Sequence, residues 1–332
     1  MKIKIAINGF GRIGRNLFRL LIHHPQIEVV AINDLADTAT MAHLLKYDSV
    51  HGKLNESVSF NEHHLIVNER EIAFLHEKDI TKLNWNPFNV DFVIEATGKH
   101  KTTELLHHHI ENGAKRVILS VPPDDNEIKT VVLGVNEHIL DGSELIVSNA
   151  SCTTNNAAPM IQVIKDLCGL DKAFITTVHS YTTDQSLHDQ PHKDLRRARG
   201  AAQSIIPTTT GAAKALTKIF PEYEGKIGGG GIRVPVPDGS LTDITCYVNR
   251  DVTEQEINEA FKKASDNGLR GVLEYTEDPI VSIDVVGNTH SCLFDAQLTV
   301  VLGRMVKVVG WYDNEIGYSS RLIDLILFLS KK

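Results

Sequence analysis

The chain has 332 residues, of which 42% are hydrophobic and 23% charged, and its formal net charge is −8. This length predicts two folded domains, and the acidic balance argues against nucleic acid as the main partner. Four widely spaced cysteines without a CxxC pair favour a reducing compartment, which we take to be the cytoplasm. We expect no signal peptide and no membrane span, because no apolar run approaches the roughly 20 residues that a spanning helix needs.

In the first 150 residues, short β-rich runs alternate with helical patterns. Strands are expected at 3–8, 29–33, 92–96, 116–120, 131–135 and 145–148, and helices at 12–23, 40–47 and 102–112. This alternation predicts an α/β domain with a doubly wound parallel sheet. The runs 64–67 and 71–75 flank Asn68-Glu69, which predicts an inserted hairpin.

A glycine-rich turn follows the first expected strand. Gly9, Gly11 and Gly14 fit the GxGxxG pattern, which allows a tight turn, close approach of a pyrophosphate and close packing of strand and helix. Asp34 ends the second strand, where a carboxylate accepts hydrogen bonds from an adenosine ribose and repels a 2′-phosphate. We therefore predict a Rossmann-type domain that binds NAD, the alternative being a similar turn that binds nothing.

Three consecutive histidines, His107 to His109, fall on the expected helix 102–112. Glu104 and Glu111 lie beside them, so we interpret the run as a solvated helix face. We predict no metal site.

Cys152 follows the expected strand 145–148, at the start of an amphipathic segment. The backbone N–H groups and the dipole at a helix N-terminus favour a thiolate, and its neighbours are Ser, Thr and Asn. His179, at the end of an expected strand, is a candidate base for this nucleophile. An inert core cysteine is the alternative, and Pro159 either kinks the helix or marks where a regular helix begins.

After residue 150 the β runs are longer. They are expected at 174–180, 232–248, 281–286 and 293–311, with a helix starting at Thr253, where Glu256 completes the form of a capping box. These runs predict an α+β domain with a largely antiparallel sheet. The last stretch, 317–329, has apolar residues on one helical face.

Several long motifs occur in order along nearly the whole chain. They are INGFGRIGR, SNASCTTNN, HSYTTDQ, PHKDLRRARGAAQSIIPTTTGAAKA, RVP and WYDNEIGYSSR. With these motifs the sequence resembles the glyceraldehyde-3-phosphate dehydrogenase family from end to end. The resemblance implies phosphorylating oxidation of D-glyceraldehyde 3-phosphate to 1,3-bisphosphoglycerate, with NAD and inorganic phosphate.

The resemblance also implies roles for individual residues. Cys152 attacks the aldehyde to give a hemithioacetal, with His179 as base and later acid, and phosphate attacks the thioester formed after hydride transfer. The substrate's own phosphate is held by Thr182 and Arg233. The attacking phosphate is held by Ser151, Thr153, Arg197, Thr210 and Gly211. The cofactor pattern maps onto Arg12, Ile13, Asp34, Lys78, Ser120 and Asn314.

The implied organisation is an NAD-binding domain at 1–150, completed by a C-terminal helix at 317–332, and a catalytic domain at 151–316. The loop 181–203 is implied to lie between the subunits of a homotetramer. Without the resemblance, Arg196, Arg197 and Arg199 would be interpreted as a solvated basic loop.

The sequence departs from the family pattern at Gln190, Asn156, Ile316 and Asp238-Gly239, and none of these positions carries a catalytic group. One alternative activity is dehydrogenation of erythrose 4-phosphate on the same scaffold, although the segment SYTTDQSLHDQPHKD favours the three-carbon substrate. A binding or regulatory protein without catalysis is the alternative of another class. An intact Cys152 and His179 argue against it.

Overall fold

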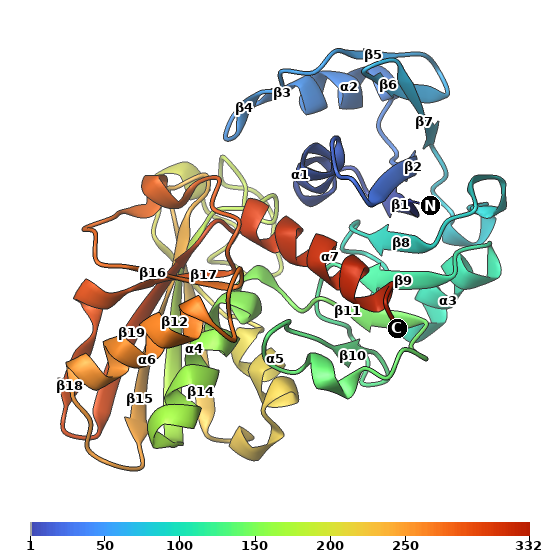
Figure 1. Ribbon diagram of the computed structural model, residues 1–332. Helices are drawn as coiled ribbons and strands as arrows, with labels where there is room; N and C mark the ends of the chain where they lie inside the picture. Colours follow the sequence, from blue (N-terminus) through green and yellow to red (C-terminus); the bar gives the residue numbers. More distant parts are fainter. Residues whose placement is uncertain (1) are drawn as a thin grey trace. The chain divides into compact units, whose positions relative to one another are not determined.

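The structure of the protein, a computed structural model, describes residues 2–332 (Figure 1). The chain divides into two compact units. The first runs to Val131 and also contains His138–Ala150 and Ser319–Lys332, and the second comprises Val132–Glu137 and Ser151–Tyr318. In the part of the chain that the structure describes, no helix is long and apolar enough to cross a membrane.

The first unit is built on a nine-stranded sheet in the order β10-β11-β9-β8-β1-β2-β7-β6-β5. Its strands are β1 (Ile3–Asn8), β2 (Ile27–Asn33), β5 (Val58–Phe60), β6 (His64–Val67), β7 (Arg70–Leu75), β8 (Phe92–Glu95), β9 (Arg116–Leu119), β10 (Lys129–Thr130) and β11 (Ile146–Ser148). The pairs from β10 to β7 are parallel. The doubly wound parallel sheet is thus confirmed, with β1 at its centre between β2 and β8.

Three helices accompany this sheet, and a short antiparallel pair is added outside it. The helices are α1 (Arg12–Leu21), α2 (Thr38–Lys46) and α3 (Thr103–Glu111), and the pair is β3 (Tyr47–Asp48) and β4 (Gly52–Lys53). The buried side chains of Trp85, Leu106 and Val117 belong to one core cluster of this unit. The expected helices 12–23, 40–47 and 102–112 each differ from these bounds by a few residues.

One expected strand is wrong and the expected hairpin is confirmed. Residues 131–132 have no regular structure, 133–136 form a turn, and the edge strand of the sheet is Lys129–Thr130. Strands β6 and β7 pair in an antiparallel manner, and both residues of their turn, Asn68 and Glu69, have positive φ (51° and 65°). A two-residue turn of this kind matches the right-handed twist of the flanking strands.

The second unit contains an eight-stranded sheet whose main path runs β13-β14-β12-β15-β19-β17-β16, with β18 paired to β19. Its strands are β12 (Leu170–Ser180), β13 (Ile206–Thr208), β14 (Ile227–Val234), β15 (Ser240–Val248), β16 (Leu273–Thr276), β17 (Cys292–Asp295), β18 (Val300–Leu302) and β19 (Met305–Tyr312). Only β12–β14 and β16–β17 are parallel among the pairs of this sheet, within residues 2–332. The largely antiparallel sheet is confirmed.

Three helices pack against this sheet: α4 (Cys152–Cys168), α5 (Ala212–Ile219) and α6 (Glu254–Asp266). Helix α4 contacts both other helices and strands β15 and β19 (Figure 1). The capping box is present, since Thr253 and Glu256 each accept a backbone N–H of the other. Pro159 lies inside α4, which continues past it.

Two expectations for this unit are corrected. Residues Ser282–Val285 form a 3₁₀ helix instead of a strand. The expected runs 232–248 and 293–311 are each divided by turns into separate strands. The terminal helix is α7 (Ile316–Leu329), and from Ser319 onward it belongs to the first unit. At its end, Nη1 of Arg116 donates to the carbonyl of Leu329 at 2.7 Å.

Candidate active site

Cys152 is the first residue of helix α4, as the sequence predicts. Ser151 caps the helix, its hydroxyl oxygen accepting the N–H of Thr154 at 3.1 Å. Ala150, just before the cap, has φ of 55°, a left-handed conformation that is unusual for a residue with a Cβ. Such backbone conformations persist where the surrounding structure enforces them, and they gather at functional sites. The chain therefore turns sharply to place the thiol at the helix start.

The imidazole of His179 reaches this thiol. Sγ of Cys152 lies 3.4 Å from Nε2 of His179, which is the penultimate residue of β12. The other ring nitrogen, Nδ1, lies 2.8 Å from the carbonyl oxygen of Ser180. With the proton on Nδ1, donated to this carbonyl, Nε2 accepts a proton from the thiol. With the proton on Nε2, Nδ1 instead accepts from Nη1 of Arg233 at 2.6 Å. The pair thus has the geometry of a nucleophile and its base.

Burial disfavours the charged form of both members of the pair. It raises the pKa of the Cys152 thiol above its ordinary value, although the charge of Arg233 and the N–H of Thr153 oppose this shift. Burial, followed by the charge of Arg233, lowers the pKa of His179 to about 3. The helix N-terminus, which favours a thiolate, therefore acts against the effect of burial at Cys152.

Arg233 is placed beside His179 by strand pairing. Strands β12 and β14 are parallel, and His179 lies directly opposite Arg233 in their register. Nη1 of Arg233 lies 2.6 Å from Nδ1 of His179 and donates to the carbonyl of Ser180 at 2.8 Å. A guanidinium at this position is available to a substrate anion next to the nucleophile.

Tyr312, at the end of β19, is a site residue that the sequence reasoning did not single out. Its hydroxyl lies 2.9 Å from the hydroxyl of Thr153 and 3.1 Å from that of Thr177. Its ring packs edge-on against the ring of His179, with centroids 5.9 Å apart. Tyr312 therefore ties the start of α4 to β12. The motif WYDNEIGYSSR contains it, but no local spacing indicates these long-range contacts.

Asn314 is hydrogen-bonded to the end of β12. Its Oδ1 accepts from the hydroxyls of Ser180 and Ser240, each at 2.8 Å, and the hydroxyl of Ser240 accepts the N–H of Ser180 at 3.1 Å. With Oδ1 used twice inside the protein, the amide nitrogen of Asn314 is the group left to donate to a ligand.

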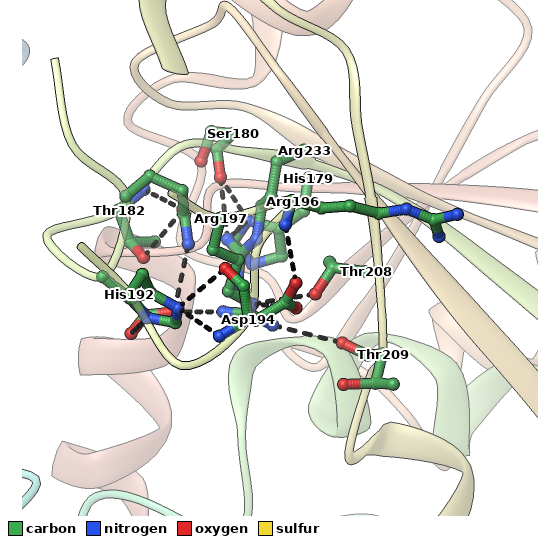
Figure 2. Close-up of polar contacts among 12 residues, drawn as sticks. His179, Ser180, Thr182, His192, Asp194, Arg196, Arg197, Thr208, Thr209 and Arg233 are labelled. Carbon is green, nitrogen blue, oxygen red and sulfur yellow. Dashed lines mark hydrogen bonds and ion pairs between the residues drawn. The ribbon is translucent and has the colours of Figure 1, made fainter. Parts of the chain in front are cut away.

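A second arginine, Arg197, lies near His179, on the loop that follows β12 (Figure 2). Arg197 donates from Nε to the hydroxyl of Thr208 at 2.8 Å, and its Nη1 bonds the carboxylate of Asp184. Thr182 lies on the same loop, and its N–H and hydroxyl both donate to Oε1 of Gln185, at 2.9 and 3.3 Å. The structure thus gathers Arg233, Arg197 and Thr182 in one region of the second unit.

The other expected phosphate ligands lie at helix starts. The hydroxyl of Ser151 is used in the cap of α4, and that of Thr153 contacts Tyr312. Thr210 accepts the N–H of Ala212 at 3.2 Å, and Gly211 is the cap of α5. The N-termini of α4 and α5 therefore both contain residues that are expected to bind phosphate.

The first unit contains a pocket of about 500 Å³ at the carboxyl ends of β1, β2 and β8. Among its lining residues are Gly9, Gly11, Asp34 and Lys78 of the expected cofactor set. Gly9 has φ of 98°, and a Cβ there would lie 2.7 Å from the backbone of Ala96. A Cβ on Gly11 would meet nothing within 4 Å, so the backbone faces open space that a pyrophosphate can enter.

The other expected cofactor residues are not among the lining residues of this pocket. A Cβ on Gly14 would lie 2.3 Å from the carbonyl of Gly9, which fits its expected packing role. Arg12 donates to the carboxylate of Asp48 at 2.5 Å. Ile13 is in the first turn of α1, and Ser120 follows β9 and is buried.

His109 corrects the interpretation of the histidine run, because its side chain is fully buried. The indole N–H of Trp85 donates to its Nδ1 at 3.1 Å, so Nε2 carries the proton and donates to Glu95 at 3.1 Å. Glu95 also accepts from Nδ2 of Asn8 at 2.6 Å, and Asn8 lines the pocket. The sequence did contain a signal for this burial, because His109 lies three residues after the apolar Leu106 and so on the same face of the helix.

We expect His109→Leu to lower the melting temperature by roughly 5–10 °C. The change leaves the carboxylate of Glu95 and the indole N–H of Trp85 short of a buried partner, at a cost of about 3 kcal/mol. His108→Leu is the matched control, because His108 makes a surface pair with Glu111 at 2.9 Å. Thermal unfolding followed by circular dichroism measures both. Equal, small shifts for the two variants would contradict a structural role for His109.

The chain is similar to known proteins over its full length. The sequence family described as "Glyceraldehyde 3-phosphate dehydrogenase, NAD binding domain" matches residues 3–103, and its C-terminal domain counterpart matches 151–314. Glyceraldehyde-3-phosphate dehydrogenase 1 of Bacillus subtilis is 50% identical over 334 residues, covering 100% of this chain and 99% of the relative. The corresponding protein of Geobacillus stearothermophilus is 51% identical over 334 residues, with the same coverage.

Proposed function

Because the chain belongs to the glyceraldehyde-3-phosphate dehydrogenase family, we propose that it oxidises D-glyceraldehyde 3-phosphate to 1,3-bisphosphoglycerate, with NAD and inorganic phosphate. It is an NAD-dependent oxidoreductase of glycolysis. The observation that supports the proposed chemistry is the thiol of Cys152 at 3.4 Å from Nε2 of His179, with the guanidinium of Arg233 beside them. A nucleophile, a base and an anion clamp are the groups that thioester formation on a phosphorylated aldehyde requires.

Cys152 and His179 move one proton back and forth. Sγ attacks the aldehyde carbon, and the thiol proton passes through Nε2 of His179 to the carbonyl oxygen, giving a hemithioacetal. NAD, when bound, supplies the acceptor for the hydride that leaves this carbon. His179 takes up the hydroxyl proton as the thioester forms. An oxygen of inorganic phosphate then attacks the thioester, the C–S bond breaks, and the proton on His179 returns to the sulfur.

The placement of the cations supports two sites for phosphate. The substrate phosphate is assigned to Arg233 and Thr182, because Arg233 lies next to the catalytic pair. The attacking phosphate is assigned to Arg197, Thr210 and Gly211 together with Ser151 and Thr153. The starts of α4 and α5 contribute backbone N–H groups and the positive ends of two helix dipoles.

The cofactor is assigned to the pocket of the first unit. The pyrophosphate would lie on the backbone at Gly9, Gly11, Arg12 and Ile13, and the adenosine ribose at Asp34. The carboxylate of Asp34 is fixed by the N–H groups of Phe10 (2.7 Å) and Ala36 (3.0 Å). Lys78 and Ser120 complete the set in this unit, and the family pattern adds Asn314 from the second unit.

We expect NAD to be preferred over NADP by about a hundredfold or more in kcat/KM. The 2′-phosphate would lie against the carboxylate of Asp34, and a like-charge contact of this kind costs several kcal/mol. Steady-state kinetics with both cofactors measures the ratio. Asp34→Asn should narrow it, and equal efficiencies in the unchanged protein would contradict the assignment.

The second unit presents an apolar surface that supports the proposed homotetramer. Phe174 and Val300 lie in one row across the sheet, Tyr247 and Leu302 in the next, and all four side chains are exposed. On the loop 181–203, Leu187 and Leu195 are 70% and 81% exposed. Subunit contacts would cover these patches. The cytoplasm is the proposed compartment, consistent with four free cysteines.

The decisive assay follows NADH absorbance with glyceraldehyde 3-phosphate or erythrose 4-phosphate, each with and without inorganic phosphate. We expect phosphate-dependent NADH formation that is much faster with the three-carbon substrate. NADH formation that does not require phosphate, or that favours erythrose 4-phosphate, would overturn the proposal.

A further inference from the structure

The guanidinium of Arg197 has a partner at each of its nitrogens. Nε donates to the hydroxyl of Thr208 at 2.8 Å, Nη2 donates to the carbonyl of Thr209 at 3.3 Å, and Nη1 bonds Oδ2 of Asp184. The side chain is only 17% exposed. These contacts use three of the five N–H groups, so an anion that approaches Nη1 meets the carboxylate of Asp184 on the same nitrogen. Asp194, 3.5 Å from Nε, is the other carboxylate that pairs with this guanidinium.

We propose that the carboxylate of Asp184 is an internal counter-ion of Arg197, which inorganic phosphate displaces, and that Asp184 thereby sets the apparent affinity for phosphate. This inference rests on the proposed function of Arg197 as a ligand of the attacking phosphate. Phosphate suits the exchange, because a guanidinium binds its oxygens in a bidentate manner through charge-assisted hydrogen bonds.

The surroundings of Asp184 allow its carboxylate to move away from Arg197. Its side chain is 51% exposed, so a displaced carboxylate passes directly into solvent. Burial opposes its ionisation, but the hydrogen bond and charge of Arg197 outweigh this, and the pKa of Asp184 lies below its ordinary value. The group is therefore an anion at neutral pH. His192 Nε2, 3.6 Å from Oδ1, is a second partner on the same loop.

A second carboxylate near Arg197, that of Asp194, is held differently. Its Oδ2 lies 3.5 Å from Nε of Arg197, and its Oδ1 accepts the N–H of Arg196 at 2.9 Å (Figure 2). This backbone hydrogen bond anchors Asp194 to the turn. Asp184 is bonded instead by the side chain of Gln185, whose Nε2 donates to Oδ2 at 3.1 Å. Gln185 also accepts the N–H of Thr182 at 2.9 Å.

The test is Asp184→Asn in the full-length enzyme, with phosphate varied at saturating aldehyde and NAD. We expect KM for phosphate to fall on the order of threefold or more, and kcat and KM for the aldehyde to stay within about twofold. Asp184→Glu, which keeps the anion, should retain a high KM for phosphate. Asp189→Asn is the matched control, because it removes the same charge from the same loop, where Asp189 pairs with Arg199 at 2.9 Å.

A second readout does not depend on turnover. Inorganic phosphate alone should raise the melting temperature of Asp184→Asn at lower concentrations than it does for the unchanged protein. A KM for phosphate that is unchanged or higher in Asp184→Asn overturns the inference, and so does a fall confined to KM for the aldehyde. If Asp184→Asn does not fold, Asp184→Ser is measured by the same criteria. Failure of the proposed function is a separate outcome, since the unchanged enzyme would then form NADH without phosphate.

Discussion

Replacing His179 by asparagine is expected to lower kcat by about 10²–10⁴-fold, the usual contribution of a positioned general base. The side chain of His179 places Nε2 at 3.4 Å from the sulfur of Cys152, and burial raises the pKa of that thiol. An amide nitrogen in its place cannot accept the thiol proton. The variant must therefore rely on spontaneous ionisation of a cysteine that is harder to ionise than an exposed one.

The pH dependence separates this role from a structural one. The pKa of His179 is lowered to about 3, so the imidazole is neutral and able to accept a proton at every pH above about 4. In His179→Asn, kcat should instead keep rising with pH towards the raised pKa of the thiol. Alkylation of Cys152 by iodoacetamide should show the same dependence. His290→Asn, the same change beside the exposed pair with Glu274, is the control. A parallel loss in both variants, with an unchanged pH profile, would contradict the role.

Arg233→Ala is expected to reduce kcat/KM for glyceraldehyde 3-phosphate by about 10–100-fold, which corresponds to charge-assisted hydrogen bonds of about 1.5–3 kcal/mol. Unphosphorylated glyceraldehyde, which has no anion for the clamp, should be turned over at nearly the same rate by both proteins. The measurement is kcat/KM on the two aldehydes.

The control for this change is Arg196→Ala, because Arg196 is exposed and its side chain extends away from His179 and Arg233 (Figure 2). Arg233 also contacts Nδ1 of His179 and the carbonyl of Ser180. Equal losses on the phosphorylated and unphosphorylated aldehyde would therefore assign Arg233 to holding His179 in place, and would refute a clamp for the substrate phosphate.

The features that the sequence predicted well are those encoded by neighbouring residues. The glycine turn after β1, the capping box at Thr253 and the start of a helix at Cys152 each depend on a few adjacent positions. The strand predicted at 131–135 is wrong because a short buried apolar run fits an irregular segment followed by a turn as well as a strand. The segment 281–286 was wrong for the same reason, since a single turn of 3₁₀ helix also buries one apolar residue, Val285.

Other features depend on residues that are far apart in the chain. Burial raises the pKa of the Cys152 thiol against the effect of the local helix terminus. Tyr312 contacts Thr153 across 159 positions. The carboxylate of Asp184 on Arg197 is a loop contact without a periodic pattern. Side-chain pairing of this kind becomes visible only when the chain has folded.

The pairing of His179 with Arg233 across β12 and β14 has a consequence for how such enzymes diverge. Because side chains alternate along a strand, a slip of one residue would turn Arg233 to the opposite face of the sheet. Insertions or deletions are therefore excluded inside either strand. The connection between them is constrained where β13 pairs with β14 and where it carries Arg197, Thr210 and Gly211. Substitutions at exposed loop positions such as Leu187 and Leu195 leave the strand register untouched, so the distance between base and clamp does not depend on the surface of the loop.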